Sequence, residues 1–227
     1  MHPILLIIIA ITVVISIMGF QKIHFFEKYK FNVSAIQNRK EYIRLLSAGF
    51  LHADFGHLFF NMLSLYLFAG TVINGTFVKN GEYYDKVEGF GVSGFLIIYF
   101  GAILLGNLFS LYLYKRQSWY SAIGASGGVS GIVFAAVALA PNDVSINFLP
   151  GFAFGALYFG YSVYMMLNPR PHDNIGHAAH LGGAAFGLVY AVALQPEVAM
   201  SNAFYLGVMS LPLIYMSYQV FVKKKIG

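Results

Sequence analysis

The sequence predicts an all-α protein that crosses a membrane several times and folds as one bundle. Hydrophobic residues make up 58% of the 227-residue chain and charged residues only 10%, whereas soluble domains have roughly 45–50% and 25%. Several apolar runs approach the ~20 residues that a helix needs to span a bilayer. Because no long polar segment separates these runs, we expect a single transmembrane domain over residues 1–227.

Seven segments are candidate helices. The first starts close to the N-terminus without a basic region before it, and no small-residue cleavage signal follows it. We therefore expect a retained helix and not a signal peptide. The apolar runs are 4–20, 58–73, 91–114, 127–140, 148–167, 178–194 and 203–222.

The fourth of these runs is too short to cross a bilayer. Its 14 residues give about 21 Å of helix, whereas the hydrocarbon core is about 30 Å thick. This helix should therefore start below the membrane surface. Non-helical backbone at that depth, here residues 121–125, is tolerated only where it lines a water-filled cavity or is buried in protein.

The connections differ in character. Residues 21–56 interleave cations with aromatic side chains, which favours short helices lying in the membrane interface. Residues 74–90 are rich in glycine and charge, so we expect an exposed loop.

The ionisable residues exclude several kinds of site and partner. The chain has no cysteine, which excludes disulfides, thioether-linked haem and thiolate metal sites. Its net charge of +5 comes from cations that flank apolar runs. We therefore expect contact with the lipid bilayer and its anionic headgroups, and no nucleic-acid partner. We also expect no metal and no cofactor, and the sequence specifies no oligomeric state.

Three polar clusters stand at the starts of predicted spans. His57 and Asn61 are four residues apart and share one helix face. The repeat "GASGGVSG" contains Ser126 at the start of the short helix, and "HAAHLGG" contains His180 at the start of the sixth. Polar groups inside a membrane point to function by default.

Each cluster alone could serve packing, because the pairs Gly127/Gly131 and Gly183/Gly187 have the small-xxx-small spacing of close helix contacts. Together, however, the clusters supply a nucleophile, a base and donors for a developing negative charge, which acyl transfer requires. Close approach of the two glycine-bearing helices would also bring a serine to a histidine.

The motifs "FLHADFGHLFFNM", "GASG" and "AHLGG" occur in this order, and Arg44 and an apolar stretch lie ahead of "FLH" in the first loop. In these features the sequence resembles the rhomboid family of intramembrane serine proteases. The resemblance covers about residues 1–194. It implies a six-helix rhomboid core, to which 203–222 adds a seventh transmembrane helix.

The resemblance implies that Ser126 is the nucleophile and His180 the general base, in a dyad without an acidic third member. It also implies that His57 and Asn61 complete an oxyanion hole with the Ser126 backbone N–H. The position of Ser126 agrees, because a helix start offers free N–H groups and the positive end of the dipole.

The second serine and histidine have other expected roles. Ser130 lies one turn deeper than Ser126, where the backbone N–H groups are already bonded, so we expect a packing residue. His177 is expected nearer the surface, in a supporting or interfacial role. His52 and Asp54 lie just before the second helix and could cap it or orient the loop.

The resemblance implies an endopeptidase that cleaves transmembrane-anchored proteins. A non-proteolytic relative that binds client transmembrane helices is the main alternative. A zinc protease would need an H-E-x-x-H motif and an aspartyl protease two intramembrane carboxylates, and the sequence has neither. A transporter would show intramembrane charges or paired broken helices.

Two arguments give opposite orientations. Twelve of the 14 Lys and Arg residues lie in 21–56, 115–123, 168–177 and the tail after 222. The positive-inside rule would place the first loop and the mouth of the active site on the cytoplasmic side. The resemblance, which we follow for the active site, places the same loop and mouth on the extracytoplasmic side. It also implies that the protein lies in a bacterial cytoplasmic membrane.

Overall fold

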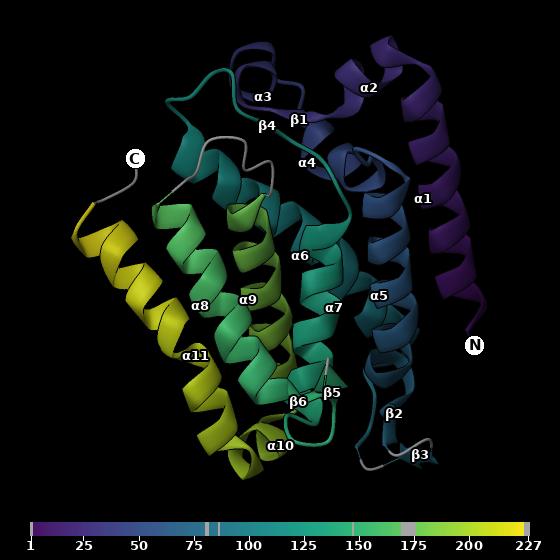
Figure 1. The fold of residues 1–227 in the computed structure, drawn as a ribbon, viewed down its shortest axis with the longest axis vertical. Coiled ribbons are helices and arrows are strands. Elements are labelled where there is room, and N and C mark those ends of the chain that lie inside the picture. Colours follow the sequence, from purple (N-terminus) through teal and green to yellow (C-terminus); the bar gives the residue numbers. More distant parts are fainter. Residues whose placement is uncertain (1, 80–81, 86, 147, 169–175, 225–227) are drawn as a thin grey trace.

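A computed structural model describes residues 2–79, 82–85, 87–146, 148–168 and 176–224. Most long helices run side by side along one axis (Figure 1). The long helices are α1 (Pro3–Gln21), α5 (Phe55–Asn74), α6 (Gly91–Tyr114), α7 (Ser126–Leu139), α8 (Gly151–Leu167), α9 (His177–Leu194) and α11 (Ala203–Ser217), which continues as a π-helical turn (Tyr218–Val222).

The remaining elements are short. The short helices are α2 (Ile23–Tyr29), α3 (Val33–Arg39), α4 (Arg44–Ser47), the 3-10 turn η1 (Ala48–Phe50) and α10 (Pro196–Ser201). The strands form three antiparallel pairs: β1 (Phe31–Asn32) with β4 (Ser121–Ala122), β2 (Thr76–Lys79) with β3 (Glu82–Asp85), and β5 (Ser145–Ile146) with β6 (Leu149–Pro150).

The predicted polytopic all-α fold is confirmed. Among the described residues, five helices, including Ala203–Val222, are long and apolar enough to cross a membrane, and α7 and α8 are shorter apolar helices. Two helix starts differ from those of the apolar runs by three residues. The start of α5 moves back to Phe55, because Asp54 caps it, and that of α8 moves forward to Gly151, because the two residues before it form β6.

The short helix α7 lies in the middle of the bundle. All its residues after Ser126 are buried, and it packs chiefly against α9, α6 and α5. Its sequence is mostly Gly, Ala and Val, so neighbouring helices can approach it on several sides. The start of α7 is therefore surrounded by protein.

Glycines set the distance between α7 and α9. A Cβ added at Gly183 would lie 2.1 Å from the carbonyl oxygen of Gly127, and one at Gly187 would lie 2.0 Å from that of Gly131. Both distances are far below van der Waals contact, so backbone meets backbone here. The four predicted packing glycines thus lie at one helix contact.

The C-terminal helix α11 packs along α8 (Figure 1). The fully buried side chain of Met209 fills the notch at Gly155, where an added Cβ would lie 2.3 Å from its sulfur. Helix α11 thereby packs closely against α8.

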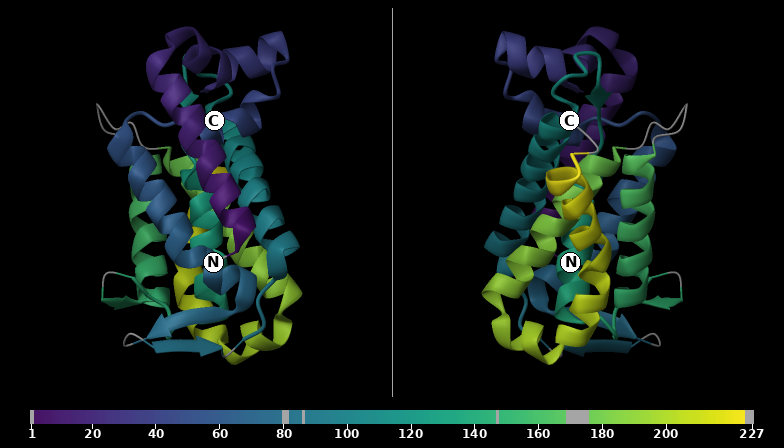
Figure 2. Two further views of the ribbon diagram at one scale, coloured as in Figure 1. Left: turned by 90° about the vertical axis from the view of Figure 1, so that its right-hand side faces the viewer. Right: turned by 90° about the vertical axis from the view of Figure 1, so that its left-hand side faces the viewer.

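The connections gather at two ends of the bundle. The short helices α2 and α3 lie at one end, and the β2–β3 hairpin lies at the other (Figure 2). The hairpin, with Thr76 opposite Asp85 and Lys79 opposite Glu82, replaces the loop expected over 74–90. The dipeptide Asn80-Gly81 between two short runs was the sequence signal for it.

Replacement of Gly187 by Ala should destabilise the protein, because the new Cβ would overlap the Gly131 backbone. We expect the free energy of unfolding to fall by about 1–3 kcal/mol, as overpacked cores do. Thermal unfolding in one detergent measures it. The matched control is Gly160→Ala in α8, where an added Cβ meets nothing within 4 Å. Equal melting temperatures for the two variants would contradict the close contact.

Candidate active site

The segment before α7 is held by the connection between α1 and α5. Strand β4 pairs with β1, so that Asn32 lies opposite Ser121. Further along, the Gly124 N–H donates to the Ala48 carbonyl at 3.0 Å, and the Ala125 N–H donates to Nε2 of His52 at 3.3 Å. Backbone contacts at Ser121, Gly124 and Ala125 thus hold the turn that leads into α7.

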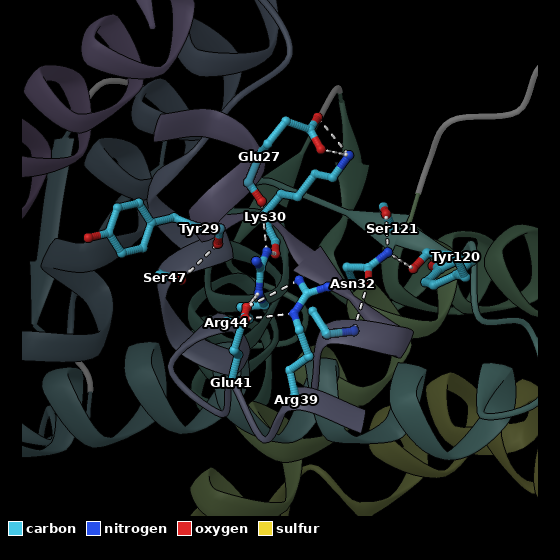
Figure 3. Close-up of polar contacts among 11 residues, drawn as sticks. Glu27, Tyr29, Lys30, Asn32, Arg39, Glu41, Arg44, Ser47, Tyr120 and Ser121 are labelled. Carbon is cyan, nitrogen blue, oxygen red and sulfur yellow. Dashed lines mark hydrogen bonds and ion pairs between the residues drawn. The ribbon is translucent and has the colours of Figure 1, made fainter. Parts of the chain in front are cut away.

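Arg44 organises that connection (Figure 3). The residue is only 4% exposed, and its guanidinium donates to the Glu41 carboxylate and to the carbonyl oxygens of Glu27 at 2.8 Å and Lys30 at 2.7 Å. Hydrogen bonds from Arg39, and then from Arg44, hold the pKa of Glu41 at about 2. One buried cation therefore ties α2 to α4.

His52 is fully buried and uses both ring nitrogens. The Ser16 hydroxyl of α1 donates to the Phe50 carbonyl at 2.9 Å, so its oxygen accepts from Nδ1–H of His52 at 2.8 Å. Nε2 is then free to accept the Ala125 N–H. Burial, with a smaller effect from His57, lowers the pKa of His52 to about 3, which keeps this neutral form in place.

The structure brings Ser126 and His180 together. Nε2 of His180 lies 2.6 Å from the Ser126 hydroxyl oxygen, and both side chains are partly exposed. Ser126 is the first residue of α7, and the first helical hydrogen bond runs from the Val129 N–H to Ala125 O. The backbone N–H groups beside the hydroxyl therefore have no partner within the helix.

The other serine and histidine lie differently. The Ser130 hydroxyl is 2.8 Å from the hydroxyl of Tyr158, so it faces α8. His177 is 5% exposed, whereas a more superficial position was expected. The ring of Tyr161 from α8 covers it edge-on, with ring centroids 5.8 Å apart.

His57 points at the turn before Ser126. Asp54 caps α5 by accepting the His57 backbone N–H at 2.7 Å. The Ala53 N–H reaches Nδ1 at 3.5 Å, so the ring proton is assigned to Nε2. A Cβ added at Gly124, where φ is +120°, would lie 2.9 Å from this Nε2 and 3.5 Å from the Ser126 hydroxyl oxygen. Both atoms thus border one small space, which only glycine leaves open.

Asn61 lies one turn further along α5. Its side-chain amide donates one hydrogen bond to the His57 carbonyl at 2.9 Å, and the residue is 7% exposed. The amide has a second N–H. Asn61 and Ser126 line the same cavity.

Two cavities border the residues of this site. The mouth cavity, of about 400 Å³, lies at the end of the bundle and is lined by residues that include His57, Trp119, Ser121 and Gly176. The lateral cavity, of about 210 Å³, lies between α5, α7 and α8 and is lined by residues that include Phe60, Ser126, Phe154 and Tyr158. No cluster of three His, Asp or Glu side chains that could hold a metal occurs among the described residues.

A sequence model described as the Rhomboid domain matches residues 39–197. The chain belongs to the rhomboid family. The matched segment runs from the end of α3 into α10, so α1 and α11 of this rhomboid protein lie outside it.

Three curated relatives illustrate the similarity. Rhomboid protein 1, mitochondrial, of Saccharomyces cerevisiae is 26% identical over 163 residues, which cover 69% of this chain and 43% of the relative. Putative rhomboid protease YdcA of Bacillus subtilis is 28% identical over 151 residues, or 66% and 65%. The human presenilin-associated rhomboid-like protein, mitochondrial, is 28% identical over 154 residues, or 64% and 36%. The chain thus matches about a third to two thirds of each relative.

Sequence reasoning missed two residues of this rhomboid site. His52 belongs to the motif "FLHADFGHLFFNM", but nothing in the sequence indicated that its ring would accept a hydrogen bond from the backbone N–H of Ala125, 73 positions away. Tyr158 lies in an aromatic-rich apolar run, where its spacing gave no signal for a contact with α7.

Acidification should weaken the fold through His52. Its pKa in the folded protein, about 3, is below the ~6.5 of an unfolded chain. As the pH falls, the unfolded state therefore takes up a proton first. The stabilisation of the fold that neutral His52 contributes is complete above about pH 6.5 and is lost as the pH falls toward 3. The slope is at most about 1.4 kcal/mol per pH unit. Urea unfolding of the wild type and of His52→Gln, from pH 7.5 to 4.5, measures it. An equally steep loss in the Gln variant would exclude His52 as the cause.

Proposed function

We propose that this rhomboid protein is an intramembrane serine endopeptidase that cleaves transmembrane-anchored proteins. The observation that carries the proposal is the 2.6 Å contact between the Ser126 hydroxyl and Nε2 of His180, at the start of a buried helix. A hydroxyl with an adjacent base is the arrangement that activates a serine for attack. The name of the Bacillus subtilis relative, a putative rhomboid protease, agrees with this proposal.

The reaction follows from these two groups. Nε2 of His180 takes the hydroxyl proton while the Ser126 oxygen forms a bond to the carbonyl carbon of the scissile peptide. Collapse of the tetrahedral intermediate breaks the C–N bond, and the imidazolium gives its proton to the leaving amine. Water then attacks the acyl ester with His180 as base, which releases the new carboxyl end and restores the serine.

The negative oxygen of the intermediate needs donors already in position. Nε2–H of His57 borders the space beside Gly124 together with the Ser126 hydroxyl, and the Ser126 N–H stands at a helix start. Asn61 lines the same cavity as Ser126 and has an amide N–H beyond the one bonded to His57 O. We assign His57, Asn61 and the Ser126 N–H to the oxyanion hole.

The lateral cavity suits a substrate that arrives from the membrane. It lies between α5 and α8, and Phe60 and Phe154 give it an apolar lining down to Ser126. We place the enzyme in a bacterial cytoplasmic membrane, because among these three relatives the match covers the largest share of the one from Bacillus subtilis. We also propose that residues 1–227 form one domain. A rhomboid-like protein that only binds client helices would use the same cavity without needing the dyad.

Ser126→Ala should abolish cleavage with little loss of stability, whereas Ser130→Ala should keep substantial activity, because its hydroxyl faces Tyr158 and not a histidine. Purified protein in detergent is incubated with a panel of transmembrane substrates, and product masses are read. A fluorophosphonate probe should label the wild type but not Ser126→Ala or His180→Ala. Cleavage by Ser126→Ala equal to that of the wild type would exclude the dyad, whereas a wild type that binds these substrates without cleaving them would favour the client-binding alternative.

Asn61→Ala should lower kcat by about 10- to 1,000-fold at nearly unchanged KM if the amide stabilises charge that appears only in the intermediate. If the residue only bonds within the bundle, the loss should appear as about 0.6–2 kcal/mol of stability. Turnover per folded molecule, with a melting curve in the same detergent, separates these results. A variant that melts early but turns over normally would contradict the oxyanion role.

A further inference from the structure

Tyr158 touches the residue that we assign as the base. Its ring lies nearly parallel to that of His180, with ring centroids 6.3 Å apart and planes at 20°. This is an offset stack within the usual range for aromatic pairs. Tyr158 belongs to α8, whereas His180 belongs to α9 and Ser126 to α7. A third helix therefore reaches the Ser126–His180 pair.

The Tyr158 ring is held at both ends. Its backbone is part of α8, and its hydroxyl is 2.8 Å from that of Ser130, one turn after Ser126 on α7. The rings of Phe134 and Phe154 pack against it, with centroids 5.4 and 5.8 Å away. The ring thus crosses from α8 to α7 and cannot turn without breaking a contact.

The His180 ring needs such a support. The torsion between a histidine Cβ and its ring has a broad energy profile, whereas the hydrogen bond from the Ser126 hydroxyl is directional. A flat surface stacked on one face of the imidazole narrows the range of ring rotation. Without it, fewer molecules hold Nε2 where it can accept the Ser126 proton.

We propose that Tyr158 is a positioning residue that holds the His180 ring in line with Ser126, and that Ser130 fixes Tyr158 through its hydroxyl. This inference rests on the proposed function of the dyad. It also couples the base to α8, which borders the lateral cavity and packs chiefly against α11 and α9. Displacement of α8 away from α7 withdraws the ring from His180, so the dyad is intact only while α8 is seated.

The test compares two substitutions with a matched control. Tyr158→Leu should lower kcat about 3- to 10-fold at unchanged KM, and the rate of fluorophosphonate labelling should fall equally. Tyr158→Phe keeps the ring and loses only the hydroxyl, so it should lower both rates less than Tyr158→Leu does. The control Tyr161→Leu removes a tyrosine–histidine ring contact between the same two helices, but to His177, which meets His180 only edge-on, with ring centroids 6.3 Å apart. It should therefore lower kcat less than Tyr158→Leu does. A raised KM at normal kcat in Tyr158→Leu would overturn the proposal.

A double-mutant cycle tests the tether without removing the ring. Ser130→Ala, Tyr158→Phe and the double variant each lose the same hydrogen bond, so each should lower kcat by the same factor of about two to three. Effects that multiply in the double variant would show that Ser130 does not act through Tyr158. This cycle remains informative if Tyr158→Leu folds poorly.

A readout that needs no turnover separates this proposal from the proposed function. The 15N shift of His180 Nε2 in labelled protein should report a hydrogen bond in the wild type and its loss in Tyr158→Leu. An unchanged shift in that variant would overturn the positioning role. A wild type with the bonded shift but without cleavage or labelling would instead count against the protease function, while loss of the shift in Tyr158→Leu would still support positioning.

Discussion

Backbone contact between α7 and α9 is the constraint on which the rest of the site depends. Where glycine faces glycine, the distance between the two helices is set by main-chain atoms, which cannot rotate away as side chains can. In this contact Gly127 directly follows Ser126 in α7, and Gly183 lies three residues after His180 in α9. The 2.6 Å contact between Ser126 and His180 is therefore a result of helix packing, and no loop is needed to bring the two residues together.

The connection between α1 and α5 contributes a second, independent constraint. Packing of α7 places the helix, but not the turn through which the chain enters it. That turn is fixed by bonds from Gly124 and Ala125 to a segment which buried Arg44 holds in shape. Three parts of the chain that are distant in sequence thus fix the position of Ser126. They are the contact of α9 with α7, the pairing of β1 with β4, and the neutral ring of His52.

The sequence predicted what local composition and spacing determine. Apolar runs located the helices to within a few residues, and the shortness of 127–140 showed that α7 starts within the protein. Paired glycine spacings indicated which helices meet and that a serine would approach a histidine, whereas the choice of Ser126 rested on its place at the helix start and on the family resemblance. The register of β1 with β4 was not predictable, because two-residue strands carry no alternation. The contacts of His52 and Tyr158 were also missed, since each depends on how helices distant in sequence are turned about their axes.

The two cavities give the site separate approaches, with a kinetic consequence for the proposed reaction. The lateral cavity faces lipid between α5 and α8, while the mouth cavity is lined by His57, Ser121 and Gly176 at the polar end of the bundle. A peptide arriving through the first and water arriving through the second do not compete for the same path. In the proposed reaction, water from the mouth cavity, which borders the site at His57, would then set the lifetime of the acyl-enzyme.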